Sequence, residues 1–77
     1  MRYIEKVLNN FEENMEKPII EEDDIFKLFE TDDVVIELIM EGFFNIYKAY
    51  SESYDGAISF ILENGYLIEA HIIDEEM

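Results

Sequence analysis

An excess of carboxylates is the strongest constraint on how this chain can fold. Its 77 residues include 20 Asp or Glu and five Lys or Arg, which gives a formal net charge of −15 at pH 7. Repulsion among these charges opposes compaction. The chain is nevertheless 49% apolar, whereas disordered acidic segments combine high charge with low hydrophobicity. We therefore expect a folded domain with a strongly acidic surface.

The length predicts a single domain over residues 1–77 with one small core. Cysteine is absent, so neither disulfides nor thiolate metal sites can support that core, and six Phe and five Tyr supply much of its packing material. The apolar runs are too short to span a membrane, and the first residues lack the apolar stretch of a signal peptide. We expect a cytoplasmic protein that does not bind membranes.

Residues 3–16 have the pattern of an amphipathic helix. Apolar side chains recur at spacings of three and four, as at Ile4, Val7 and Phe11, which is typical of one buried stripe. The residue before a proline avoids the helical backbone region, so Pro18 predicts the end of this helix.

A run of four carboxylates at residues 21–24 precedes an apolar segment at residues 25–29. Carboxylates in the first turn of a helix are stabilised by the helix dipole. The run therefore predicts a second, short helix that begins there. The polar residues 31–33 predict a cap before the next apolar segment.

Residues 34–52 allow two interpretations. Their many β-branched and aromatic residues favour strands, and Glu41 with Gly42 is a candidate hairpin turn. The polar residues favour a helix, because they recur at spacings of four, four, three and four; they are Glu37, Glu41, Asn45, Lys48 and Glu52. Because strand alternation ends at Glu41, we predict one long central helix, followed by a loop over residues 51–56.

Residues 57–73 predict a β-hairpin with its turn near Asn64 and Gly65. A two-residue turn pairs Leu62 with Leu67 and mixes polar and apolar side chains on both faces. A three-residue loop pairs Leu62 with Tyr66 and gathers one apolar face: Ile58, Phe60, Leu62, Tyr66, Ile68, Ala70 and Ile72. Since burial of one face sets the register, we predict the three-residue loop.

Together these elements predict an α+β fold in which two or three helices pack on a C-terminal antiparallel β-hairpin. The alternative is an antiparallel meander sheet with an N-terminal helix. A lone hairpin is marginal and leaves open edges, and Ile61, Leu67 and Ile73 fall on its unburied face. A homodimer that covers this face or pairs these edges is expected.

Candidate catalytic groups are few. Nucleophilic catalysis requires an activated Ser, Thr, Cys or Lys beside a base, and the single histidine, His71, is predicted on the polar hairpin face near Glu69. Calcium loops need oxygen ligands at alternating positions around a glycine, a pattern that residues 21–24 lack. We expect no enzymatic activity, no bound metal and no cofactor.

The acidic surface itself is the candidate functional feature. Its predicted partner-binding residues are Glu12, Glu16, Glu21, Glu22, Asp23, Asp24, Asp32, Asp33, Glu37 and Glu41. Carboxylates four residues apart on a helix lie about 5–6 Å apart at their Cβ atoms, comparable to the spacing of phosphates along a nucleic-acid strand. The few scattered cations argue against direct nucleic-acid binding, so the expected partner is a basic protein.

These carboxylates favour a nucleic-acid mimic of the kind that phages and mobile elements encode. Such a small inhibitor binds the basic groove of a nuclease, polymerase or DNA-binding protein. The alternative is an acidic protein-interaction module, such as an immunity protein, antitoxin or small subunit, which binds one partner mainly by apolar contacts.

Overall fold

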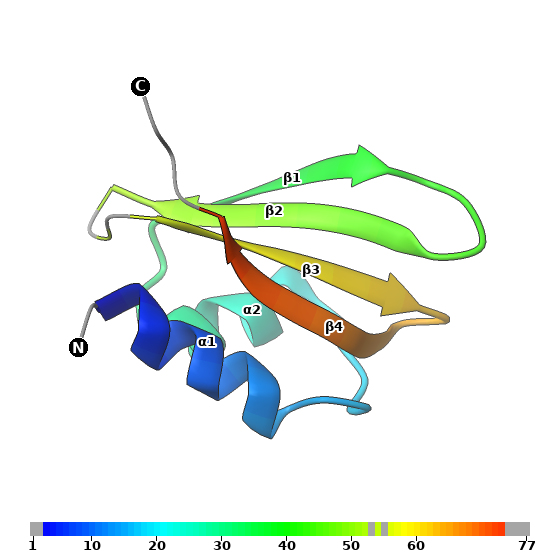
Figure 1. Ribbon diagram of the computed structural model, residues 1–77, viewed down its shortest axis with the longest axis horizontal. Coiled ribbons are helices and arrows are strands. Elements are labelled where there is room, and N and C mark those ends of the chain that lie inside the picture. The colour runs from blue at the N-terminus through cyan, green and yellow to red at the C-terminus, as the bar shows by residue number, and fades with distance from the viewer. Residues whose placement is uncertain (1–2, 53, 55, 74–77) are drawn as a thin grey trace.

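The protein is a two-layer α+β domain. The computed structural model describes residues 3–52, 54 and 56–73, with the elements α1 (Tyr3–Glu13), α2 (Glu22–Phe29), β1 (Val34–Met40), β2 (Asn45–Ser51), β3 (Ala57–Glu63) and β4 (Tyr66–Ile73). The strands form one antiparallel sheet in the order β1-β2-β3-β4. Both helices lie on one face of this sheet, and no described helix or strand covers the opposite face (Figure 1).

The core joins the two helices to the second half of the sheet. Phe11 of α1 lies at its centre, with ring centroids 5.8 Å from Phe29 of α2 and 5.3 Å from Phe60 of β3. Each of these rings is essentially fully buried, and such burial contributes about 1.5–3 kcal/mol per side chain. Helix α1 packs on β3, β4 and α2, so the β1–β2 half of the sheet has the thinner cover.

Helix α1 has the predicted buried stripe but is shorter than the predicted range 3–16. It ends at Glu13, and Glu16 adopts a left-handed φ of 65°. The Glu16 N–H donates to the carbonyl of Leu67 at 2.6 Å, so the chain leaves the helix axis before Pro18 and runs beside β4. Backbone pairing with β4 therefore ends the helix earlier than the proline does.

Helix α2 begins where the carboxylate run predicted. Glu21 is its N-cap residue and the next three carboxylates form its first turn. The segment that follows, residues 31–33, leads into a strand and caps no helix. Instead Asp33 accepts hydrogen bonds from the hydroxyls of Thr31 at 2.7 Å and Ser51 at 2.8 Å, which links the start of β1 to the end of β2.

The predicted helix over residues 34–52 is wrong, because this segment forms the β1–β2 hairpin. Glu37 and Lys48, which seemed to belong to one helical stripe, are opposite each other on neighbouring strands. Asn45 accepts a hydrogen bond from the Gly42 N–H at 3.4 Å across the loop. The helical period therefore arose from one cross-strand pair and two loops, and the β-branched and aromatic composition was the better guide. The alternative fold, a meander sheet, is the one observed.

The β3–β4 hairpin is confirmed, but its predicted register is wrong along the whole hairpin, because Leu62 does not pair with Tyr66 and, farther from the turn, Phe60 pairs with Ala70. Asn64 and Gly65 both have positive φ, as a two-residue hairpin turn requires, and Leu62 pairs with Leu67. A β-bulge then resets the alternation, so that farther along β4 apolar side chains again face the helices. Leu67 is consequently in the core, whereas Tyr66 and Ile68, which we predicted to be buried, are 49% and 42% exposed.

Candidate functional site

A group of large, exposed apolar side chains lies at the end of the β1–β2 hairpin. We call it the hairpin tip; its members are Leu38, Ile39, Met40, Phe43 and Phe44. Figure 1 shows this hairpin extending past the ends of both helices. Phe43 is 100% exposed and Ile39 is 58% exposed. Exposed apolar side chains grouped at one end of a small domain are typical of an interaction site.

A β-bulge in β1 contributes to this exposure. Leu38 pairs with Tyr47 and Met40 with Ile46, so Ile39 is the additional residue. A bulge increases the local twist and re-aims side chains. The sequence did not predict the hairpin tip, because the helix predicted over residues 34–52 placed these residues on its buried apolar side. The available signal was an apolar Phe43-Phe44 pair directly after the Glu41-Gly42 turn candidate.

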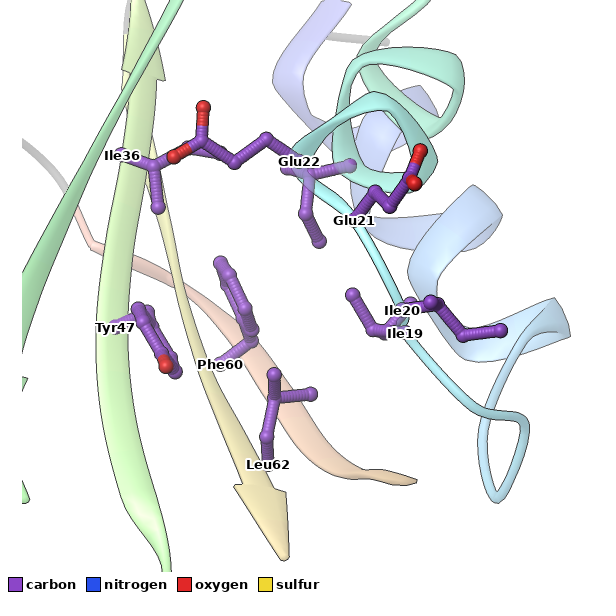
Figure 2. Close-up of a pocket in the computed structure, with 9 residues that line it drawn as sticks. Ile19, Ile20, Glu21, Glu22, Ile36, Tyr47, Phe60 and Leu62 are labelled. Carbon is purple, nitrogen blue, oxygen red and sulfur yellow. The ribbon is translucent and has the colours of Figure 1, made fainter. Parts of the chain in front are cut away.

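An apolar cleft lies beneath β1 and β2, between the sheet and the start of α2. Its volume is 220 Å³, and its lining residues are Ile19, Ile20, Glu21, Glu22, Ile25, Ile36, Tyr47, Phe60 and Leu62. In Figure 2 the aromatic and aliphatic side chains converge from both walls, and the Glu22 side chain extends toward Ile36. Two of the lining residues are acidic and none is basic, so the cleft has an apolar floor and an acidic rim.

Part of the predicted acidic set lies along β1. Asp32 and Asp33 precede this strand, Glu37 lies within it and Glu41 follows it. From the helical layer, Glu22 reaches the cleft below the same strand. These carboxylates come from two segments of the chain: residues 32–41, which run along one edge strand, and Glu22 of α2, which lines the cleft below it.

The other predicted acids lie elsewhere or have a structural role. Glu12 is on α1 and Glu16 lies beyond the end of that helix, beside the β3–β4 turn in a shallow recess with Tyr66 and Ile68. The backbone N–H groups of Ile20 and Glu21 donate to Asp24 Oδ2 at 2.9 and 3.2 Å. Both hydrogen bonds lower the pKa of Asp24, and the bond from Ile20 has the larger effect.

The sheet face opposite the helices, which we call the open face, carries mixed chemistry. Alternation along the strands places on it an apolar group composed of Val35, Ile46, Tyr50, Ile61 and Ile73. A polar row of register partners crosses its middle: Glu37, Lys48, Ser59 and His71. His71 lies 3.8 Å from Glu69 through Nδ1, as its predicted position on the polar face implied.

The polar row contains the single histidine of the chain, His71. Ser59 and His71 are register partners, but no hydrogen bond joins their side chains among the described residues. Within residues 3–52, 54 and 56–73, three or more potential metal ligands do not cluster anywhere. No described helix is long and apolar enough to cross a membrane.

Comparison with known proteins adds no relative to these observations. No family model matches the chain, and neither a curated protein nor a solved structure matches it.

Proposed function

We propose that this protein is an acidic protein-interaction module that binds one basic protein partner mainly through the hairpin tip. The observation that supports this function best is the complete exposure of Phe43 among four other large, exposed apolar side chains. Exposed aromatic side chains at the centre of an interface typically supply most of the binding energy. A tip of this composition is suited to inserting into an apolar recess of another protein.

The net charge has a separate role in this proposal. Complementary charge raises association rates and selects partners more than it raises affinity. At −15 the chain repels other acidic proteins and attracts basic ones. The carboxylates around β1 lie on the strand that leads into the tip, so they attract a basic surface toward the apolar contact.

Capture from a lysate of the encoding organism tests this function. The variant Phe43→Ala/Phe44→Ala removes the two rings, and Ile68→Ala removes a side chain of exposure similar to Phe44 (42% against 41%) on the distant strand β4. Loss of two hot-spot rings should reduce retention of the captured partner by about tenfold or more. The control Ile68→Ala should retain it as the wild type does. Equal retention by the Phe43→Ala/Phe44→Ala variant would show that the tip is not the contact.

Nucleic-acid mimicry remains a second candidate, favoured by the net charge. One of its premises is weakened, because Glu37 and Glu41 lie along an extended segment and not on a helix. Four residues of strand span about 13 Å, against the 5–6 Å expected on a helix. Duplex DNA added to the capture experiment separates the two functions. Release of the partner by DNA and by about 0.5 M salt indicates mimicry, whereas an apolar contact at the tip resists both.

A further inference from the structure

The two edges of the sheet differ in how they are protected. Along β4, the Leu67 N–H donates to the Lys17 carbonyl at 3.1 Å, and the Leu67 carbonyl accepts from Glu16 at 2.6 Å. Pro18 forms a bridge with Tyr66 beside them. The chain's own connector therefore covers the start of this edge, and a proline stands within the cover, a common protection of sheet edges.

The opposite edge, on β1, has no comparable cover among the described residues, where β2 is its only sheet neighbour. We call the outer side of residues 34–38 the β1 edge. These residues pair regularly with β2, because the bulge begins only after Leu38. They include one charged residue, Glu37, and no proline, glycine or lysine. A regular, mostly apolar edge of this kind readily accepts another strand.

The cleft lies directly inside this edge. Ile36 points from β1 into the cleft, and Glu22 approaches it from α2 (Figure 2). The volume of 220 Å³ is below the roughly 300–1,000 Å³ of small-molecule pockets. An apolar cavity of about 150 Å³ can hold benzene. The cleft is therefore large enough for one bulky apolar side chain, such as that of a residue on an added strand.

Charge determines what kind of strand fits. Carboxylates flank the β1 edge at Glu22, Asp32, Asp33, Glu37 and Glu41, and the nearest strand cation, Lys48, is already the register partner of Glu37. A second copy of the chain is a poor occupant. A symmetric antiparallel pair of these edges, centred on Ile36, brings the two Glu37 side chains onto the same face as near neighbours, and like charges on neighbouring strands are destabilising.

We propose that the β1 edge accepts an extended basic segment of the partner protein as a fifth strand. One apolar side chain of that segment occupies the cleft, and its Lys or Arg side chains face the carboxylates around β1. This inference rests on the proposed function, since it adds the binding mode and the chemistry of the partner. It concerns the outer side of residues 34–38, which shares only Leu38 with the hairpin tip.

Synthetic peptides test the proposal directly. The probe is Ac-KVKLKVK-NH2, which alternates basic and apolar side chains, and its matched control is Ac-EVELEVE-NH2. Hydrogen exchange followed by NMR should show new protection of amides in residues 34–38 with the basic peptide. The acidic peptide should bind at least about tenfold more weakly, a difference of about 1.4 kcal/mol. Protection on β4 or on the open face, or equal binding of the two peptides, would overturn the proposal.

Peptide methylation separates strand addition from docking of a side chain alone. Successive N–H groups of an extended strand point to opposite edges, so N-methylation of the three apolar residues blocks one edge and N-methylation of the four lysines blocks the other. Strand addition predicts that one methylated peptide loses about tenfold or more in affinity while the other retains it. Similar affinities for both methylated peptides would rule out the fifth strand.

Two further measurements keep this test independent of the tip. The Phe43→Ala/Phe44→Ala variant should bind the basic peptide as the wild type does, so failure of the peptide experiment and failure of the tip experiment are separate results. Protection of the β1 amides that increases with protein concentration alone, without peptide, would identify a second copy as the occupant and would refute a basic partner segment there.

Discussion

At the scale of single residues, Asp24 shows how one carboxylate of an acidic run has a defined structural role. Its side chain accepts from two backbone N–H groups that precede α2, and these N–H groups have no partner within the helix. The lowered pKa of Asp24 follows from those bonds. Its neighbour Asp23 lies in the same turn and is exposed, so the two residues form a natural pair for comparison.

We expect Asp24→Asn to be less stable than Asp23→Asn at pH 7, because both remove one charge but only Asp24→Asn weakens the N-terminal bonds. A folded-state pKa below the unfolded value of about 3.8 stabilises the fold above that pH, and the stabilisation is lost as the pH falls through the folded pKa. Urea midpoints of the two variants should therefore converge below about pH 3.8. A constant difference at all pH values would contradict this assignment.

Tyr54 connects the β2–β3 loop to the helical layer. Its ring stacks on Tyr3 at a centroid distance of 4.8 Å, and its hydroxyl donates to the carbonyl of Phe29. Tyr54→Phe should lower the free energy of unfolding by about 0.5–1.5 kcal/mol, the typical contribution of one hydrogen bond. The exposed residue Tyr66 provides the control, since Tyr66→Phe should change stability by less than about 0.5 kcal/mol.

The same residue predicts an alkaline effect. Burial, and then the charges of Tyr3 and Glu30, raise the pKa of Tyr54 above its usual value of 10.0. A raised folded-state pKa gives stability that is complete below the unfolded value and is lost as the pH rises through the folded one. As the pH rises above 10, the Tm of Tyr54→Phe should therefore fall less than the Tm of the wild type. Thermal unfolding at a series of pH values measures this difference.

At the scale of elements, the two hairpins reach their geometry by different means. The β3–β4 turn depends on backbone conformation at Asn64 and Gly65, where φ is 54° and 84°. The β1–β2 hairpin has a longer loop and a bulge. Gly42 in this loop does not adopt the left-handed backbone conformation.

Replacement of the glycines should expose this difference. A Cβ at Gly65 meets its nearest heavy atom, the Ile19 carbonyl oxygen, at 4.0 Å, so the cost of Gly65→Ala comes from the left-handed backbone alone and is about 1–2 kcal/mol. Gly42→Ala meets Phe44 at 3.9 Å without that penalty and should be neutral or stabilising by up to about 1 kcal/mol. Chemical denaturation measures both, and equal effects would contradict the turn assignment.

At the scale of the whole molecule, self-repulsion should control stability. The longest dimension is 31 Å, and the screening length is about 30 Å at 0.01 M salt but about 3 Å at 1 M. At low salt every carboxylate therefore interacts with all the others. We expect the Tm to rise as salt is added, and also as the pH is lowered from 7 toward the sequence pI of about 4.1. A Tm that falls steadily with salt would show that ion pairs dominate.

Assembly is the second property at this scale. The homodimer expected from the sequence remains a prediction, and the surface that would form it is the open face, where Ile61 and Ile73 lie but Leu67 does not. Because two copies repel each other, dimerisation should strengthen with salt. Sedimentation at high micromolar concentration checks this. A monomer at both 0.05 M and 0.5 M salt would contradict the prediction.

Local patterns in the sequence were sufficient for the elements that form through nearby contacts. The spacing of Ile4, Val7 and Phe11 predicted the buried side of α1, the carboxylates at 21–24 predicted the start of α2, and the β3–β4 hairpin was predicted over its correct range. In each case the deciding interaction is either within a few residues along the chain or a burial pattern of a single element. The acidic charge and the absence of cysteine were likewise properties of composition alone.

Tertiary structure decided whether residues 34–52 became a helix or strands. Their polar spacing fits a helix, and only pairing of β2 with both β1 and β3 stabilises the extended form. Tertiary structure also decided where α1 ends. It decided the register of β4 as well, because a bulge can restore the apolar face after a tight turn. The candidate site depended on these outcomes. The cleft exists only because distant segments are assembled. The hairpin tip and the β1 edge are local in sequence, but their exposure depends on what the rest of the chain leaves uncovered, and local periodicity has no information about that.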